Sequence, residues 1–249
     1  MSAAILQAQG LAKRYGGTEV LAGIDLQAET GRVLAVVGPS GCGKSTLLNI
    51  LSGLLPPDGG QLLVDGVPAR RFGQWQRIAY MFQEDRLLPW RSVLDNVAFG
   101  LEAARLSRRQ RRQRAQSALA LVGLAEVAQA WPHELSGGMR SRVALARSLA
   151  VRPDVLLMDE PFSKLDPQTR TQMHQELLRI QAASGTTVVF VTHDMEEAVV
   201  LADRIVRLRP NPGRVAEVVD LASLARPRDP LSPLVAERVR ALRAAMGAG

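Results

Sequence analysis

Short apolar runs alternate with helical stretches along this chain, which is the pattern of an α/β protein. Residues 33–37, 155–158 and 187–191 are apolar runs of about five residues each, the length and composition of buried parallel strands. The stretch 167–183, which separates the last two runs, has helical composition. A helix that joins two parallel strands is the usual crossover connection. We therefore predict a parallel sheet with helices packed on its faces.

Two further regions depart from this core pattern. Up to about residue 26, apolar and polar residues alternate as they do in edge strands, and residues 61–67 and 77–82 indicate further short strands. Residues 94–150 are rich in Ala, Leu and Arg, and this composition predicts helix throughout. The pattern therefore predicts one α/β unit that carries a helical insertion.

Composition narrows the class of protein only a little. A chain of 249 residues with 47% apolar residues can bury a full core, and its apolar runs are far shorter than the roughly 20 residues that cross a bilayer. The N-terminus lacks the pattern of a secretory signal. A single cysteine, Cys42, agrees with a reducing compartment. We expect a cytoplasmic protein that does not itself span a membrane.

The net charge of +7 raises the question of an anionic partner. The densest basic stretch, residues 105–114, carries six arginines in a segment of helical composition. A solvated helix face is the favoured interpretation, followed by proximity to anionic lipid. Nucleic acid comes last, because no aromatic platform or base-reading motif accompanies the arginines. No nucleic-acid partner is therefore expected.

A glycine-rich loop follows the first buried strand. Residues 38–46, GPSGCGKST, fit the phosphate-loop pattern G-x-x-x-x-G-K-[ST], between a predicted strand and a helix expected to begin at Lys44. In such a loop backbone N–H groups converge on phosphates, Lys44 reaches the β and γ phosphates, and Ser45 offers its hydroxyl to Mg²⁺. A glycine-rich turn without a ligand is the alternative, which the flanking strand and helix disfavour. The predicted phosphate-binding residues are Gly38, Pro39, Ser40, Gly41, Cys42, Gly43, Lys44, Ser45 and Thr46, with the Cys42 side chain as a bystander.

Two adjacent carboxylates end the second buried strand. In VLLMDEP, residues 155–161, Asp159 and Glu160 close an apolar run, where an acidic pair is costly unless it serves a cation or a reaction. Asp159 suits Mg²⁺. Glu160 points elsewhere and suits a general base for the water that attacks the γ-phosphate. An ordinary loop start is the alternative for this pair alone, and the phosphate loop favours the catalytic interpretation.

A third motif narrows the field of phosphate-loop proteins. LSGGM, residues 135–139, precedes the helix-like stretch RSRVALARSLAVRP. A hydroxyl and two glycines at a helix start form a second anion cradle, although a simple helix cap would use the same residues. With this motif the chain resembles the ABC ATPases over roughly residues 6–208.

The resemblance implies a fold and its subdivision. It predicts an α/β phosphate-loop, RecA-like core with an N-terminal antiparallel β-subdomain and an inserted α-helical subdomain, in a single ABC ATPase domain of residues 1–249. The core would comprise residues 1–88 and 152–249, including the C-terminal tail. The helical subdomain would comprise residues 89–151 and carry the signature motif.

The resemblance also assigns roles to single residues. Tyr15 in KRYGG is similar to the aromatic that stacks on adenine, and Gln83 in MFQED is similar to the Q-loop glutamine, which serves catalysis and Mg²⁺. Residues 163–166 are similar to the D-loop, which places Asp166 near nucleotide. His193 in VTHDMEEA is similar to the switch histidine that contacts the γ-phosphate. Without the resemblance, each of these residues has an ordinary structural interpretation.

Partners follow from the same resemblance. The implied ligands are ATP and Mg²⁺, and two subunits would pair head to tail, so that Ser136, Gly137 and Gly138 of one close over ATP on residues 38–46 of the other. A homodimer is the simplest pairing. Separate transmembrane permease subunits would hold the pair on the cytoplasmic face of the inner or plasma membrane, with a solute-binding protein as an indirect partner.

The segment after Gln83 indicates a subgroup. Residues 84–97, EDRLLPWRSVLDNV, and 209–218, RPNPGRVAEV, resemble the nitrate, sulfonate and taurine importers. Leu87, Leu88 and Trp90 would either receive a permease helix or pack the helical insertion on the core, and both interpretations stay open. We expect an importer ATPase. The alternatives are a lipid-trafficking or two-protein export system and, less favoured, a soluble ABC ATPase that acts on nucleic acid or ribosomes.

Three positions depart from the family's commonest pattern. Met139 and Ser141 stand where glutamine often occurs, but they leave Ser136 and Gly138 intact. Lys164 occupies a D-loop position that a small residue usually fills. Its ammonium group would either pair with phosphate or an acid across the subunit junction or project into solvent, and solvent is the favoured interpretation.

Overall fold

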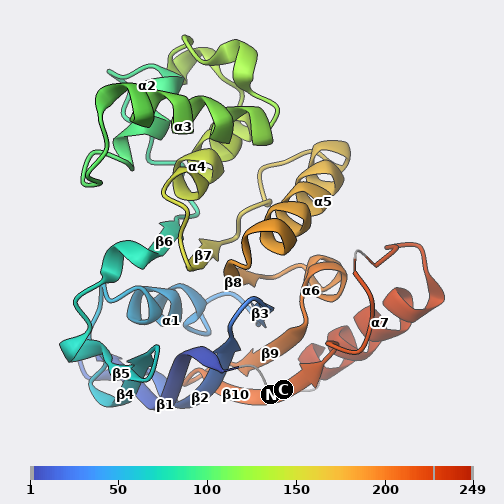
Figure 1. Ribbon diagram of the computed structural model, residues 1–249. Helices are drawn as coiled ribbons and strands as arrows, with labels where there is room; N and C mark the ends of the chain where they lie inside the picture. Colours follow the sequence, from blue (N-terminus) through green and yellow to red (C-terminus); the bar gives the residue numbers. More distant parts are fainter. Residues whose placement is uncertain (1–2, 227, 248–249) are drawn as a thin grey trace.

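The computed structural model describes residues 3–226 and 228–247, which form two sheets and a group of helices (Figure 1). The strands are β1 (Ala4–Tyr15), β2 (Thr18–Glu29), β3 (Val33–Val37), β4 (Gly59–Val64), β5 (Val67–Pro68), β6 (Ile78–Met81), β7 (Val155–Asp159), β8 (Thr187–Thr192), β9 (Arg204–Arg209) and β10 (Arg214–Asp220). The α-helices are α1 (Lys44–Leu51), α2 (Val93–Phe99), α3 (Arg108–Leu121), α4 (Gly137–Ala150), α5 (Pro167–Ser184), α6 (Met195–Leu201) and α7 (Pro233–Gly247). Short 3₁₀ turns lie at Ala69–Arg71, Trp75–Arg77, Ala125–Val127 and Pro132–Glu134. None of the helices in the described ranges is long and apolar enough to span a membrane.

The central sheet has six strands in the order β10-β9-β3-β8-β7-β6. Its strands are parallel except for β10, which pairs antiparallel with β9 at one edge. Every residue of β3, β7 and β8 is buried. Alternate side chains of these strands enter two hydrophobic clusters, one on each face of the sheet. The predicted parallel sheet with crossover helices is confirmed.

The N-terminal sheet has four strands in the order β2-β1-β4-β5, and its pairs are antiparallel. The predicted strand 61–67 is interrupted at Asp65 and Gly66, whose φ angles are 53° and 75°. Both lie in the left-handed region, which gives a tight turn between β4 and β5. This sheet shares one hydrophobic cluster with α1 and with one face of the central sheet.

The prediction of helical structure throughout residues 94–150 is wrong for the segments between the helices. Three α-helices occupy the region, and α2, α3 and α4 pack on one another as the green group at the top of Figure 1. The Ser107 hydroxyl accepts a hydrogen bond from the Gln110 N–H, and the Ser107 N–H donates one to the Gln110 side-chain oxygen. This capping box starts α3 at Arg108 and leaves Arg105 outside the helix. Gly123, at φ 66°, follows the end of α3. The division at residues 89 and 151 stays our prediction.

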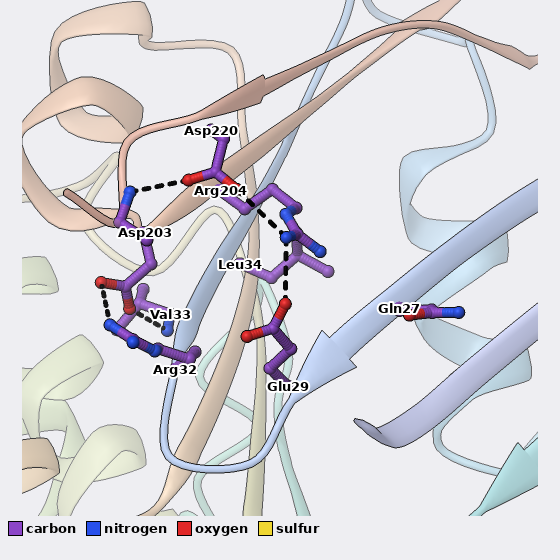
Figure 2. Close-up of a pocket in the computed structure, with 9 residues that line it drawn as sticks. Gln27, Glu29, Arg32, Val33, Leu34, Asp203, Arg204 and Asp220 are labelled. Atoms are coloured by element: carbon purple, nitrogen blue, oxygen red, sulfur yellow. Dashed lines mark hydrogen bonds and ion pairs between the residues drawn. The ribbon is translucent and has the colours of Figure 1, made fainter. Parts of the chain in front are cut away.

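Charged side chains at the start of β9 join that strand to β2, β3 and β10. Figure 2 shows Arg204 between Glu29 and Asp220, at 2.9 and 3.1 Å. Asp203, which is 4% exposed, accepts a hydrogen bond from the Val33 N–H at 2.8 Å. Beyond β10 the chain returns to α6, beside which α7 packs. The C-terminal segment is therefore part of the core that carries the site.

Candidate nucleotide site

The glycine-rich loop connects β3 to α1 and is wrapped around its own lysine. Lys44 is 7% exposed, and its Nζ donates hydrogen bonds to the carbonyl oxygens of Gly38 and Pro39 at 2.8 and 2.9 Å. Gly41 and Gly43 have φ angles of 79° and 92°, which a residue with a side chain adopts only at a cost. Cys42 is buried, and burial raises the pKa of its thiol. The loop therefore already has the shape of an anion cradle.

Asp159 lies at the carboxyl end of β7, next to the start of α1. Its carboxylate is buried, and the nearby Ser45 hydroxyl and Lys44 ammonium group favour its charged form. Burial raises the pKa of this carboxyl, because the charged form loses its hydration. Two protein oxygens beside a phosphate cradle are the donor set that Mg²⁺ accepts in nucleotide sites, where phosphates and water complete its coordination.

Glu160 is the centre of a polar cluster at the carboxyl ends of the strands. Its Oε2 accepts a hydrogen bond from Gln83 Nε2 at 3.2 Å, and its Oε1 lies 3.2 Å from His193 Nδ1. The Glu160 N–H donates to the Val191 carbonyl oxygen at 3.0 Å. The backbone at Glu160 is left-handed, with φ 46°, and such strain in a non-glycine residue is frequent at functional sites. Three predicted residues from three chain segments thus meet at one carboxylate.

Tyr15 and Asp166 are placed in less specific surroundings. The Tyr15 ring ends β1 and is 48% exposed, with the Lys13 ammonium group 5.9 Å from its centroid. Asp166 caps α5, and its Oδ1 accepts a hydrogen bond from the Thr169 N–H at 3.0 Å. This bond lowers the pKa of the Asp166 carboxyl. A nucleotide role for either residue stays a prediction.

Ser136, Gly137 and Gly138 begin α4. Ser136 Oγ accepts a hydrogen bond from the Met139 N–H at 3.2 Å, which is an ordinary helix cap. Within residues 3–226 and 228–247, no hydrogen bond or ion pair joins these three residues to the glycine-rich loop 38–46. The chain therefore holds two separate helix starts rich in glycine.

Two arginines of α4, not singled out from the sequence, hold the segment after Gln83. Arg140 Nε lies 3.1 Å from Asp85 Oδ2, and Arg147 donates to the carbonyl oxygens of Asp85 and Arg86 at 2.7 and 2.9 Å. Burial lowers the pKa of the Arg147 guanidinium. Seven residues separate the two arginines, which places them on one face of the helix. That spacing is the signal that could have revealed them.

The apolar group after Gln83 has mixed surroundings. Leu87 packs against the larger hydrophobic cluster, whereas the Trp90 side chain is 70% exposed. Asn96, which is fully buried, fixes Leu88 by donating to its carbonyl oxygen and accepting from its N–H. Packing on the core accounts for Leu87 but leaves Trp90 free to meet a partner.

Lys164, in the D-loop-like segment, is exposed in this chain.

Comparisons with known proteins give the family. The family model described as ABC transporter matches residues 21–163. The taurine import ATP-binding protein TauB of Pseudomonas entomophila is 47% identical over 220 residues, which are 88% of this chain and 84% of that protein. An uncharacterized ABC transporter ATP-binding protein of Methanocaldococcus jannaschii is 45% identical over 90% of this chain and 84% of its own length.

A solved structure agrees with the fold and with the enzyme class. It is a dimeric ATP-binding cassette in a post-hydrolysis state, bound to ADP and Pi. It is 31% identical to this chain, has a TM-score of 0.78, and the match covers 87% of this chain and 98% of that one. The ABC ATPase fold is therefore confirmed. The chain belongs to the ABC transporter family, as an ATP-binding subunit with ATPase activity.

Proposed function

We propose that this chain is the ATP-hydrolysing subunit of an importer that moves a small solute, such as taurine, another sulfonate or nitrate, through a separate membrane permease. The taurine import protein supports the direction of transport and the class of solute, because it is nearly half identical over most of both chains. The permease subunits would hold the chain at the cytoplasmic face of the membrane and connect it indirectly to a solute-binding protein.

The glycine-rich loop would hold the β and γ phosphates of ATP. On binding, Lys44 exchanges its bonds with the Gly38 and Pro39 carbonyl oxygens for bonds with phosphate oxygens, and backbone N–H groups supply the remaining donors. Ser45, Asp159 and Gln83 are the residues that would hold Mg²⁺, which would neutralise the negative charge that develops on the phosphates. Tyr15 would stack on the base from the end of β1.

Glu160 would act as the general base. Its carboxylate stands at the end of β7, between the Gln83 amide and the His193 imidazole, which fix its direction. From there it can take a proton from the water that attacks the γ-phosphate. His193, whose ring is mostly exposed, would donate to a γ-phosphate oxygen and stabilise the transferred charge.

A second copy of the chain would complete the site. The start of α4 offers an N-terminal dipole and free backbone donors at Gly137 and Gly138, and in this chain it is not bonded to the phosphate loop. A head-to-tail pair places this cradle over the ATP of the other subunit, next to Asp166 and the D-loop-like segment. Two equal composite sites then form in a homodimer.

The observation that carries the proposal is the cluster of Gln83, Glu160 and His193 beside the lysine cradle. Its test is the Glu160→Gln protein, which keeps the size and most hydrogen bonds of the side chain but removes the base. We expect ATP turnover to fall by about 10² to 10⁴-fold, the range for a lost general base. Glu126→Gln, at an exposed position away from the site, is the matched control and keeps its activity. Normal turnover in Glu160→Gln would refute the assignment of the base.

The import proposal needs its own experiment. The chain and its permease, reconstituted in vesicles, should take up taurine or a related sulfonate with ATP on the side of the chain. Trp90→Ala together with Leu88→Asp should prevent assembly with the permease while ATP binding persists, because the exposed Trp90 would fill a partner's groove. Solute export, or assembly of the doubly substituted protein at normal yield, contradicts this part of the proposal.

A further inference from the structure

A large cleft lies at the amino ends of the central strands, whereas the nucleotide site lies at their carboxyl ends. Its volume is about 710 Å³, within the range of small-molecule sites. Arg77, Asp154 and Thr186, which line it, directly precede β6, β7 and β8. Glu160 directly follows β7. At about 3.3 Å per strand residue, the two sites are roughly 20 Å apart.

Three parts of the fold meet around this cleft. The N-terminal sheet contributes Ile5, the helices α3 and α4 contribute Leu121 and Leu149, and α5 contributes Ile180. These side chains are buried or half-buried and give the cleft an apolar wall. A ligand held here would touch the helical group, the N-terminal sheet and α5 at the same time.

The polar lining is basic, and two of its arginines have no partner. Arg77 is paired with Asp65 and Asp154, which are the two acidic residues that line the cleft. Arg179 is paired with Glu176. Among the described residues, the guanidinium groups of Arg114 and Arg152 make no hydrogen bond or ion pair. The cleft therefore has an excess of positive charge from α3 and from the turn that follows α4.

The backbone at Arg152 sharpens this observation. Arg152 follows the C-cap of α4 in the left-handed region, with φ 54°. Glycine is the usual residue at this place after a helix, because a Cβ is strained there. From this position Arg152 lines the cleft.

We propose that this cleft binds a small organic anion, with a sulfonate, carboxylate or phosphate group on Arg114 and Arg152 and an apolar body against Leu121, Leu149 and Ile180. A guanidinium group binds such oxyanions through charge-assisted, often bidentate hydrogen bonds. The ligand bridges α3, α4 and α5 from outside the nucleotide site. Nucleotide therefore does not compete with it.

The probe for this site is anilinonaphthalene sulfonate, which combines one sulfonate with an apolar ring system and fluoresces when bound. With saturating ATP present, the wild-type chain should bind one dye per subunit in a saturable titration. The double variant Arg114→Gln, Arg152→Gly should bind it at least tenfold more weakly, because both charge-assisted bonds are lost. Glycine suits the left-handed backbone at 152 and glutamine suits a helix, so the variant should stay folded.

Matched controls separate a site from general attraction to a basic protein. Arg105→Gln together with Arg109→Gln removes two exposed arginines of the same region that do not line the cleft, and it should leave dye affinity unchanged. Phenylnaphthylamine, which has the same rings without the sulfonate, should bind at least tenfold more weakly than the dye. Hydrogen exchange should slow at residues 149–154 and 180–186 on dye binding.

Several outcomes would overturn the proposal. They are displacement of the dye by ATP, equal affinity for the neutral analogue, equal weakening in the control variant, and unchanged affinity in the Arg114→Gln, Arg152→Gly protein. Circular dichroism of each variant, compared with the wild type, confirms that a loss of binding is not a loss of fold. None of these readouts depends on ATP hydrolysis or transport.

Discussion

The helix that begins at Lys44 and the helix that begins at Gly137 both start beside glycines, yet only the first lies among the groups that phosphate chemistry needs. Beside Lys44 stand the Ser45 hydroxyl and the buried Asp159 carboxylate. The start of α4 has a serine cap and backbone donors but lacks a bond to that cluster in the described residues. From this difference we propose that the start of α4 completes the nucleotide site of another copy of the chain.

After Glu160→Gln, the largest expected effect comes from Asp159→Asn, which tests the site around the phosphate loop. Turnover with Mg²⁺ should fall about a hundredfold or more, because the charge that favours the cation is lost. Steady-state ATPase assays across a range of Mg²⁺ concentrations measure this. An Asp159→Asn protein with the Mg²⁺ dependence and the maximal rate of the wild type would contradict the assignment.

Asp159→Asn should lower turnover but raise the stability of the protein without nucleotide. Burial raises the folded-state pKa of the Asp159 carboxyl above its unfolded value, so the protein without nucleotide loses stability as pH rises through that raised pKa. Asp159→Asn removes this titration. Its melting temperature should therefore exceed that of the wild type at neutral pH, with a smaller fall as pH increases. Calorimetry at several pH values checks the sign.

Gly137→Glu tests the start of α4 and should lower turnover by about a hundredfold, because the added carboxylate repels the phosphates that the backbone donors would otherwise bind. A carboxylate at a helix start is tolerated by the helix dipole, and the added Cβ meets only the end of Arg140 at 3.8 Å. The chain should stay folded and bind ATP on its own phosphate loop. Wild-type turnover would show that the start of α4 has no part in the reaction.

Arg228→Met tests what joins the C-terminal segment to the end of α6. Arg228 is 5% exposed and donates to the carbonyl oxygens of Val199, Ala202, Leu221 and Leu224 at 2.7 to 3.1 Å. Loss of this guanidinium leaves buried carbonyls unpaired and should lower the free energy of unfolding by about 3 kcal/mol. Urea titration measures the change. Arg243→Met, on exposed α7 surface, is the control and should change stability little.

Lys164→Ala is expected to have the smallest effect. Lys164 is exposed beside the segment that would meet the other subunit, and its ammonium group has no partner within the described part of this chain. If it projects into solvent, ATPase turnover should stay within about twofold of wild type. A tenfold change would mean that it pairs with phosphate or an acid across the junction.

The central strands and the phosphate loop were predictable because their signals are local. A run of five buried residues such as Val33–Val37 has few alternatives, and the glycines at 41 and 43 have the positive φ angles that the loop requires. The meeting of Gln83, Glu160 and His193 was expected from the family resemblance and from the rule that ligands gather at the carboxyl ends of parallel strands.

Other features depend on contacts distant in sequence, which composition does not reveal. Helix was predicted throughout residues 94–150 because Ala and Leu favour helix, whereas α3 begins only after the Ser107 cap and ends before the turn at Gly123. The bonds of Arg147 to Asp85 and Arg86 span more than sixty residues. Arg228 likewise donates to the carbonyl oxygens of Val199 and Ala202, which lie 29 and 26 residues before it.

Light scattering of the Glu160→Gln protein with and without ATP tests the central claim most directly. If the start of α4 completes the site of a second copy, slow hydrolysis should trap a dimer in ATP, and the addition of Gly137→Glu should return it to a monomer that still binds ATP. A Glu160→Gln protein that stays monomeric in ATP, or a dimer that persists with Gly137→Glu, would contradict the composite site.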